Sequence, residues 1–280
     1  MALYITSLNS GSNGNCYYVG NEDDAVLIDA GISCREVTKR MLRLNLNMRK
    51  IKAVFISHEH SDHISGLETL AKKYQLPVYI TKGTLQNSSL AIELHLVKSF
   101  TPFQPVYIGA IAVTAFPKSH DADDPHSFFI SYKNVNIGVF TDIGYACENV
   151  TRYFKQCHAA FLESNYDVDM LMNGGYPRHL KARITGGDGH LSNVQALQLF
   201  LQHRPPGMTH LILSHLSQNN NRPEIVEQLF SRHAGGVNIT VASRYAETPL
   251  YHIAGEIPMV QPVVNTVRPK TYTVLRLFED

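Results

Sequence analysis

The sequence contains no long apolar segment and few cysteines. No run approaches the roughly 18 uninterrupted apolar residues of a membrane-spanning helix, so we expect none. The N-terminal residues 1–8 lack a basic start and predict a strand rather than a signal peptide. The four cysteines show no C-x-x-C spacing, which suits reduced, buried thiols and a cytoplasmic location.

Charge of one sign is not in excess either. The formal net charge is +1, which neither supports nor excludes a nucleic-acid partner, because local patches matter more. We find no internal repeats or low-complexity tracts. With 280 residues, of which 44% are hydrophobic, the chain is long enough to bury a large core in one domain.

Helix signals separate the short apolar runs. An S-x-x-E capping box at Ser33 precedes a helix over residues 37–44, and S-x-x-Q at Ser192 precedes a helix that Pro205 would end. Pro223 would begin another helix. An apolar face at helical spacing predicts one more, through Ile64, Leu67, Ala71 and Tyr74.

The most informative stretch is H-x-H-x-D-H at residues 58–63, directly after the apolar run at 53–56. A strand that ends there would deliver these side chains together at the edge of a sheet. His58 and His60 are two residues apart, so on an extended backbone they point the same way. Imidazole and carboxylate bind Zn, Mn or Fe and leave room for water. The motif therefore predicts a metal site, and Asp62 and His63 can face a second metal as the chain turns.

Three later apolar runs also end at residues of the ligand type. The strands predicted at 111–116, 136–140 and 211–213 run out at His120, Asp142 and His215, respectively. Taken alone, each of these residues is weak evidence, because a histidine at a strand end is more often a surface or capping residue. Their repetition in order points to a shared site.

With these motifs in order, the chain resembles the metallo-β-lactamase-fold hydrolases from Leu3 to about Gly255. The resemblance implies that the first metal is held by His58, His60 and His120. It implies that the second metal is held by Asp62, His63 and His215, with Asp142 bridging both. Asp29 would orient the histidine loop without touching a metal. His126 is a weaker rival to His120, because it opens a strand and does not end one.

Within that family, the chain is most similar to the YycJ/WalJ-type proteins, which look like DNA exonucleases. The likeness lies in the opening loop at residues 10–19 and in the segments 163–167 and 189–193. The last two segments more distantly resemble a Glu and His pair of tRNase Z. The resemblance implies that His190 is the general acid and that Glu163 holds its ring. Asp62 counts among the catalytic residues as well as the ligands.

The resemblance also implies the architecture. We expect an α/β (α+β) fold, a four-layer αββα sandwich of two similar halves with helices outside. The hydrolase domain would cover residues 1–255. Residues 256–280 form a C-terminal tail, punctuated by prolines, that would add an edge strand or contact a second subunit. A dimer is therefore one alternative.

The function that follows is a dinuclear metal-dependent phosphodiesterase, a nuclease and most specifically a DNA exonuclease of the cytoplasm. A water held between two divalent metals (Zn, Mn or Fe) loses a proton near neutral pH and becomes the nucleophile. The substrate-binding candidates follow the chain in two places. The basic segment at 177–183, alternatively an ordinary solvated loop, supplies Arg178, Lys181 and Arg183, and the turn after His215 supplies Asn219.

Two other functions stay open. A small-molecule hydrolase of a cyclic phosphodiester or thioester is the main alternative, because the span from Asp142 to His215 is too short for a large inserted RNA-clamping domain. A regulatory or redox metal protein is the third. Related flavodiiron proteins carry a flavodoxin domain and an acidic residue within the ligand motif, and both are missing here.

Overall fold

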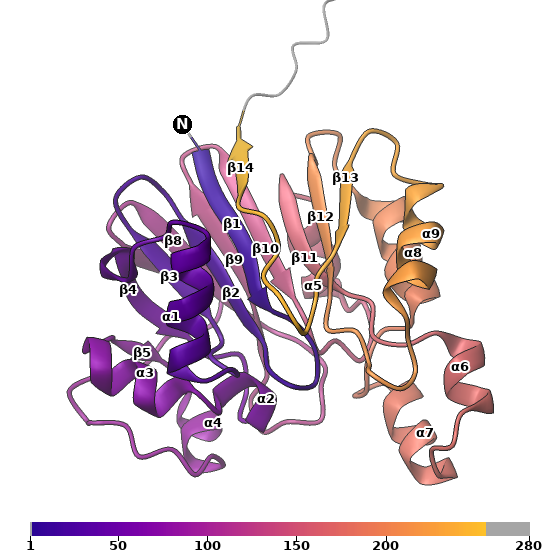
Figure 1. The fold of residues 1–280 in the computed structure, drawn as a ribbon, viewed down its shortest axis with the longest axis horizontal. Coiled ribbons are helices and arrows are strands. Elements are labelled where there is room, and N and C mark those ends of the chain that lie inside the picture. The colour runs from indigo at the N-terminus through magenta and orange to yellow at the C-terminus, as the bar shows by residue number, and fades with distance from the viewer. Residues whose placement is uncertain (1, 256–280) are drawn as a thin grey trace, which may run out of the picture.

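The computed structural model describes residues 2–255, in which two seven-stranded sheets pack face to face (Figure 1). The strand order of the first sheet is β14-β1-β2-β3-β4-β5-β6, and that of the second is β13-β12-β11-β10-β9-β8-β7. The first sheet contains β1 (Ala2–Asn9), β2 (Cys16–Gly20), β3 (Ala25–Ile28), β4 (Ile51–Phe55), β5 (Val78–Tyr79), β6 (Val97–Lys98) and β14 (Tyr251–Ala254). The second contains β7 (Pro105–Ile108), β8 (Ile111–Pro117), β9 (His126–Tyr132), β10 (Val135–Phe140), β11 (Ala159–Glu163), β12 (His210–Ser214) and β13 (Asn238–Val241).

Both sheets are mixed, and each contains four strands that run parallel. Strands β3 to β6 run parallel in the first sheet, and β10 to β13 run parallel in the second. The remaining neighbours are antiparallel hairpins or, for β14 and β1, a pairing of the two ends of the described chain. Carboxyl ends of parallel strands meet at one edge, where ligands bind in open α/β sheets.

Side chains alternate between the inter-sheet core and the helical layers. In β4, Ala53 and Phe55 face the core between the sheets, whereas Val54 packs toward the helices of the first sheet. In β11, Phe161 faces the inter-sheet core and Leu162 faces the helices of the second sheet. Strands covered on both faces are mostly apolar, as these are except for Lys52 of β4 and Glu163 at the end of β11. The expected four-layer αββα sandwich is therefore confirmed.

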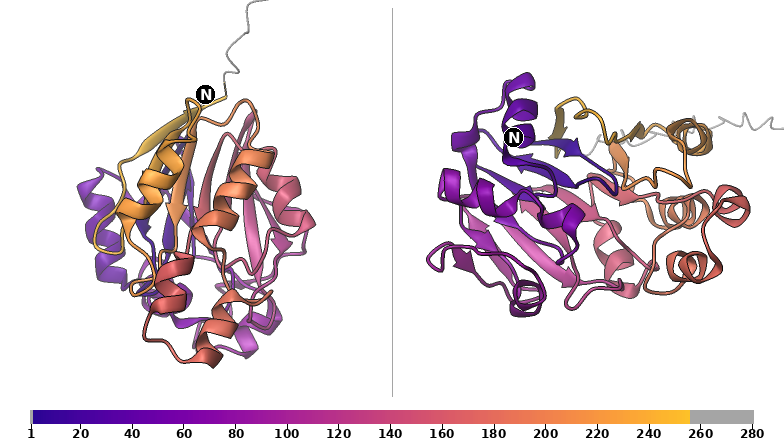
Figure 2. Two further views of the ribbon diagram at one scale, coloured as in Figure 1. Left: turned by 90° about the vertical axis from the view of Figure 1, so that its right-hand side faces the viewer. Right: turned by 60° about the horizontal axis from the view of Figure 1, so that its bottom comes forward.

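Helices cover the outer face of each sheet (Figures 1 and 2). The first sheet is covered by α1 (Cys34–Arg43) and α3 (Leu67–Tyr74), and the second by α5 (Glu148–Phe154), α8 (Asn193–His203) and α9 (Pro223–Ser231). The shorter elements are η1 (Met48–Lys50), α2 (Ser61–Ile64), α4 (Lys82–Gln86), α6 (Val168–Asn173) and α7 (Arg178–Thr185). In Figure 1, α6 and α7 project beyond the lower end of the second sheet.

The predicted helix signals agree with the observed boundaries. Ser33 accepts a hydrogen bond from the Glu36 N–H at the start of α1. Both halves of the Ser192 capping box are formed at α8, and Pro223 is the first residue of α9. The helix predicted through Ile64 to Tyr74 is instead two helices, α2 and α3. The alternative interpretation of the basic segment as an ordinary solvated loop is wrong, because Arg178–Thr185 is the helix α7.

Two further expectations concern the chain as a whole. The four cysteines are free, and three of them are buried. No helix within residues 2–255 has the length and apolarity that a membrane crossing requires. The predicted C-terminal tail, from residue 256 onward, lies outside the described residues.

Candidate metal centre

The candidate ligands follow strand ends at the edge of the sheets from which α2, α6 and α7 continue (Figure 1). His58 follows β4, His120 follows β8, Asp142 follows β10 and His215 directly follows β12. The first strand belongs to the first sheet and the other three belong to the second. The centre therefore lies where the two sheets meet.

A first group consists of three histidines. His60 has an extended backbone conformation and directly precedes α2. Its side chain points back toward His58. His60 Nδ1 lies 3.1 Å from His58 Nε2 and 3.3 Å from His120 Nε2. Nitrogens that bind one zinc ion at about 2.0–2.1 Å in tetrahedral geometry lie about 3.3 Å apart. The spacing of these nitrogens fits a shared metal ion.

A second group combines a carboxylate with two histidines. Asp62 Oδ2 lies 3.2 Å from His215 Nε2 and 3.5 Å from His63 Nε2. Asp142 lies between the two groups. Its Oδ2 is 3.1 Å from His63 Nε2, and its Oδ1 is 3.4 Å from His215 Nε2 and 3.7 Å from His120 Nε2. One carboxylate thus faces ligand atoms of both groups.

A buried carboxylate oxygen that has no hydrogen bond indicates that these residues suit metal ions. Asp142 is 2% exposed, and no donor among residues 2–255 satisfies its Oδ2 with hydrogen-bonding geometry. An unsatisfied buried carboxylate oxygen is costly. A divalent cation would satisfy it, and the donor set of imidazole and carboxylate is the one that Zn, Mn and Fe take. The residues fit two metal sites.

The pKa values of the histidines in the protein without metal indicate that this centre favours positive charge. Although burial disfavours its charge, carboxylates led by Asp142 raise the pKa of His63 well above its usual range. Burial also disfavours the charge of His215, but carboxylates led by Asp142 outweigh burial and raise the pKa of His215 to about 10. Burial lowers the pKa of His58, and it lowers that of His120 to about 4. Protons on the first two histidines therefore offset the carboxylates when metal is absent.

The loop that carries the histidines is held by Asp29. Its Oδ2 accepts a hydrogen bond of 2.7 Å from His63 Nδ1, which fixes the ring so that Nε2 faces the centre. Ser57 donates to the same carboxylate from its N–H and its hydroxyl, both at 2.8 Å. The Ser57 hydroxyl also lies 2.9 Å from His58 Nδ1. Asp29 thus lies where an orienting residue would, and Ser57 adds a contact that the motif alone did not reveal.

Glu163 contacts two histidines with different expected roles. Its Oε1 accepts hydrogen bonds from His190 Nδ1 at 2.8 Å and from His215 Nδ1 at 3.0 Å. Its Oε2 accepts the N–H groups of Ile143 and Leu191. Although burial disfavours its charge, His190 and His215 lower the pKa of Glu163 to about 2. The sequence suggested only the contact with His190, so the contact with His215 is new.

Two further polar residues at the centre had no specific role from sequence. Asn15, in the opening loop, donates to Asp62 Oδ2 at 3.1 Å. Lys118 is buried, and its amine donates to the Thr141 carbonyl at 2.7 Å, one residue before Asp142. The signal available for Asn15 was its glycine- and asparagine-rich turn. Nothing in the pattern around Lys118 distinguishes it from a surface lysine.

The rival histidine lies apart from these groups. His126 begins β9, packs edge-on against Phe100, and lies 2.9 Å from the Asp124 carbonyl through Nδ1. Among residues 2–255 it belongs to none of the clusters that could hold a metal. The geometry thus agrees with ranking it behind His120.

A cleft of about 340 Å³ opens over the centre, and α7 forms one wall. Leu180, Arg183 and Ile184 line it, together with His190 and Tyr176. Of the expected substrate-binding residues, only Arg183 reaches the cleft wall.

Arg183, at the cleft wall, is ion-paired with Asp121. The other expected substrate-binding residues lie farther out. Lys181 donates to the Met172 carbonyl, and Arg178 is exposed at the start of α7. Asn219 donates to the Tyr176 hydroxyl, whose ring borders the cleft. The structure places these residues around the cleft without bringing them together.

Three site residues have left-handed backbone at the strand ends. The φ angles of Asp29, Asp142 and His215 are 60°, 53° and 57°, respectively. Non-glycine residues adopt this region at a cost of about 1–2 kcal/mol. This strained conformation turns each side chain away from the strand direction and into the candidate metal centre. Strained backbone conformations in proteins are concentrated at functional sites.

Comparison with known proteins agrees with this geometry. A family model described as the beta-lactamase superfamily domain matches residues 24–216. The chain is 35% identical over 240 residues to the exodeoxyribonuclease YycJ of Bacillus anthracis, covering 83% of this chain and 89% of the relative. It is 32% identical over 259 residues to the exodeoxyribonuclease WalJ of Streptococcus pneumoniae, covering 88% and 96%.

Solved structures support the same fold. The metallo-β-lactamase fold protein YhfI of Bacillus subtilis superposes with a TM-score of 0.67 at 17% identity, covering 90% of this chain and 100% of that one. At this identity the likeness concerns the fold alone. The family match and the curated relatives carry the assignment further, since both extend over most of the chain. The chain belongs to the beta-lactamase superfamily and is a hydrolase of the metallo-β-lactamase fold.

Proposed function

We propose that this enzyme is a dinuclear metal-dependent phosphodiesterase that acts as a DNA exonuclease in the cytoplasm. The first metal would be held by His58, His60 and His120. The second would be held by Asp62, His63 and His215, and Asp142 would bridge the two. The observation that carries the proposal is the Glu163–His190 pair at this centre, beside two ligand groups with metal-like spacing.

Bound divalent metals would supply a nucleophile from water at neutral pH and stabilise the charge that develops on the phosphoryl oxygens. The chain supplies the remaining groups. Asp62 and Asp142 hold fixed negative charge at the centre, because burial is outweighed by the neighbouring histidines, which lower the pKa of both carboxyl groups. Asp29 orients the His63 ring.

In this proposal, His190 gives a proton to the leaving alkoxide. Its side chain is 19% exposed and lines the cleft, while its Nδ1 donates to the buried Glu163. This hydrogen bond leaves Nε2 as the atom that can transfer a proton to substrate. A hydrolase whose leaving group is a thiolate has less need for this second pair, because a thiolate leaves without being protonated.

DNA as the substrate is supported by the relatives and by α7. The two relatives described above are named exodeoxyribonucleases, and they match the chain over most of its length. Arg178, Lys181 and Arg183 lie on the helix that borders the cleft. Basic side chains beside a phosphodiester centre neutralise backbone phosphates.

A small-molecule hydrolase is the second candidate, and the size of the cleft favours it. Its volume of about 340 Å³ lies near the lower end of small-molecule pockets, which span roughly 300–1,000 Å³. Between β10 and β12 the chain carries only α5, β11, α6, α7 and α8, with no inserted domain. A cyclic phosphodiester or a thioester would be the substrate.

One activity panel separates the two. The purified chain, loaded with Zn or with Mn, is assayed on duplex DNA, single-stranded DNA, RNA, a cyclic phosphodiester, a thioester and bis(p-nitrophenyl) phosphate. We expect stepwise shortening of DNA and turnover of the small diester, both abolished by EDTA. The Asp142→Ala variant, purified in parallel, controls for a contaminating nuclease. Turnover of the cyclic diester or the thioester, without any DNA shortening, would overturn the exonuclease in favour of the second candidate.

A further inference from the structure

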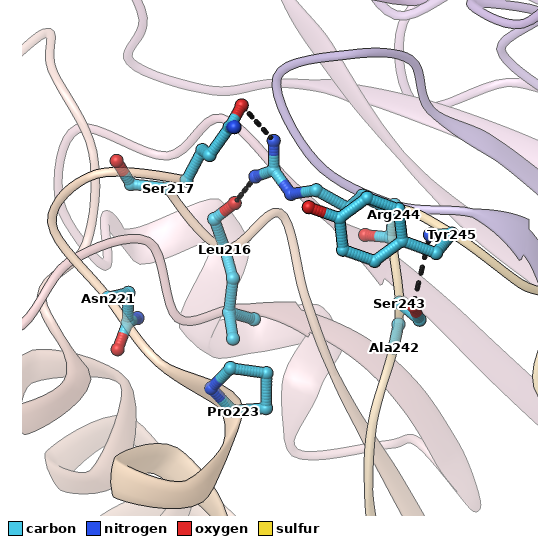
Figure 3. Close-up of a pocket in the computed structure, with 10 residues that line it drawn as sticks. Leu216, Ser217, Asn221, Pro223, Ala242, Ser243, Arg244 and Tyr245 are labelled. Atoms are coloured by element: carbon cyan, nitrogen blue, oxygen red, sulfur yellow. Dashed lines mark hydrogen bonds between the residues drawn. The ribbon is translucent and has the colours of Figure 1, made fainter.

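A second cavity adjoins the metal cleft. It has a volume of about 140 Å³, and its walls come from the segment after β12, the start of α9 and the segment after β13 (Figure 3). Ser217 lines both this cavity and the metal cleft, so the two are neighbours. Ser10, on the wall of the second cavity, accepts a hydrogen bond of 2.7 Å from the backbone N–H of His215.

The guanidinium of Arg244 is held rigidly in this cavity. It donates to the Leu216 carbonyl at 2.6 Å and to the Gln218 side chain at 3.1 Å (Figure 3). It also packs against Gly11, whose φ is +140°, and a Cβ at that position would lie 3.1 Å from the nearest guanidinium nitrogen. A guanidinium held this way is preorganised, so little entropy is lost when it binds a ligand.

The cavity offers positive charge without a counter-charge. None of the lining residues is acidic, and within residues 2–255 no carboxylate forms an ion pair with Arg244. Ser217 and Ser243 each accept a backbone N–H through their hydroxyl oxygen, which leaves both hydroxyl hydrogens available to donate. The metal cleft next to it is lined by Asp62 and Asp142. Donors and charge in the second cavity therefore suit an anion.

The size of the cavity limits which anion it can hold. Sites for drug-sized ligands span roughly 300–1,000 Å³, so about 140 Å³ admits a group of a few atoms and not a whole nucleotide. Arginine is the side chain that matches phosphate oxygens with paired donors. We propose that this pocket binds a backbone phosphate of the DNA strand, next to the phosphate that is cleaved at the metal centre.

The subsite rests on the proposed function, and its phosphate has two sources. An internal diester would give affinity for any strand, whereas a terminal monoester would give recognition of a strand end. Exposed Tyr245, which also lines the cavity, offers an aromatic face for the adjoining base or sugar.

The test compares the metal-loaded wild type with Arg244→Gln. Arg222→Gln is the matched control, because Arg222 is exposed next to α9 and does not line the cavity. For Arg244→Gln we expect the KM for duplex DNA to rise on the order of 10- to 100-fold. The dependence of log KM on log salt should flatten by about 0.9. The loss with bis(p-nitrophenyl) phosphate should be at least ten times smaller than the loss with DNA.

Substrate ends identify the source of the phosphate. If the pocket holds a terminal monoester, the wild type prefers a phosphorylated 5′ or 3′ end over a hydroxyl end, and Arg244→Gln loses that preference. If it holds an internal diester, the variant loses affinity equally for all ends. An unchanged KM and salt slope would overturn the subsite. So would equal losses on DNA and the small diester, because they would place Arg244 in the support of the metal centre.

A second pair of variants serves if Arg244→Gln does not fold. Ser243→Asp adds a carboxylate to the pocket, whereas Ser243→Asn has nearly the same shape without the charge. We expect the aspartate variant to show the higher KM for DNA, by on the order of 10-fold. Equal KM values for the two variants would contradict an anion site. No DNA cleavage by the wild type itself would instead remove the proposed function, and the subsite with it.

Discussion

At the residue scale, the centre depends on backbone conformations that a sequence pattern does not display. The apolar runs predicted which residues follow strand ends, and these residues do gather in one place. The left-handed φ angles of Asp29, Asp142 and His215 turn the side chains inward, and no local spacing rule signals them. The shared use of Glu163 by two histidines was hidden for a similar reason, since His190 and His215 are separated by a complete helix and strand.

Replacing Asp142 by alanine should weaken the binding of both metals. The carboxylate faces His63 of one group and His120 of the other, so its loss removes a ligand shared by both sites. Metal content per chain, measured by mass spectrometry after dialysis, should fall from about two to below one. Asp169→Ala, at an exposed position on α6, is the control and should keep both metals. Two tightly held metals in Asp142→Ala would refute the bridging role.

Replacing His190 by alanine should separate proton donation from metal binding. We expect normal metal content and a turnover of DNA that is roughly 10²–10⁴-fold lower, because the leaving alkoxide needs a proton. The loss on bis(p-nitrophenyl) phosphate should be much smaller, since its leaving group needs little protonation. The measurement is kcat on both substrates. Equal losses on the two, or a loss of metal, would argue against the acid role.

Glu163→Gln should behave differently from His190→Ala. Because Glu163 Oε1 contacts His215 as well as His190, the glutamine weakens the orientation of a candidate ligand and of the candidate acid together. We expect affinity for the second metal to fall by about 10–100-fold, as is usual when the hydrogen-bond partner of a metal ligand is lost. Titration of metal-free protein with Zn would measure it. Wild-type affinity would mean that Glu163 acts through His190 alone.

At the scale of elements, capping residues predicted helix boundaries and composition did not. Ser33, Ser192 and Pro223 begin α1, α8 and α9 as expected, because a cap acts on its own first turn. The break between α2 and α3 occurs at Gly66, where a Cβ would lie 1.8 Å from the Ile32 carbonyl. That close approach comes from a distant loop and is not visible locally. Helix α7 has no side-chain cap, so it gave no such local signal and was not foreseen.

Removing the charges of α7 tests its role as an element of the DNA surface. The triple variant Arg178→Gln, Lys181→Gln and Arg183→Gln should bind DNA more weakly. Its salt dependence should flatten by roughly one unit for each lost phosphate contact. A triple variant at Arg35, Lys39 and Lys73, which line a groove between α1 and α3, removes the same charge elsewhere. If both triple variants lose the same affinity, α7 acts only through net charge.

At the scale of the whole molecule, the family resemblance implied the layered fold, and the alternation of apolar runs with helical patterns agreed with it, but neither predicted which strands pair. Apolar runs on both faces imply buried strands between helices. The neighbour of each strand is a long-range property: Ala2 pairs with Ala254, at opposite ends of the described chain. The meeting of the two sheets at one edge, which assembles both ligand groups, has the same long-range origin.

Metal removal should make the stability of the whole molecule sensitive to alkaline pH. His215 has its pKa raised from 6.5 to about 10, so its stabilisation is complete below pH 6.5 and is lost as pH rises through about 10. His120 and Glu163 act in the other direction. Burial lowers the pKa of His120 to about 4, so protonation of this ring destabilises the fold as pH falls below 6.5, and Glu163, with its pKa lowered to about 2, loses its stabilisation as pH falls. In EDTA-treated protein, Tm should therefore decrease between about pH 7 and 10.

The metal-loaded protein is the control for this prediction. Bound metals replace the protons as the positive charges at the centre, and metal binding improves as histidines lose protons. Its Tm should change little over the same alkaline range. If Tm falls equally with rising pH in the two forms, protons on the buried histidines do not offset the carboxylates in the metal-free protein.

Each ligand group draws on both sheets. The first takes His58 and His60 from the loop after β4 and His120 from the end of β8, and the second adds His215 from the end of β12. A metal ion bound at either site would therefore cross-link the two sheets, which otherwise contact each other through apolar side chains and a few hydrogen bonds such as that from the His215 N–H to Ser10, with no disulfide among the four cysteines. With metal bound, the sheets would separate only after coordination bonds break. The unfolding rate of the metal-bound enzyme would then be limited by metal dissociation, a kinetic protection that equilibrium stability does not measure.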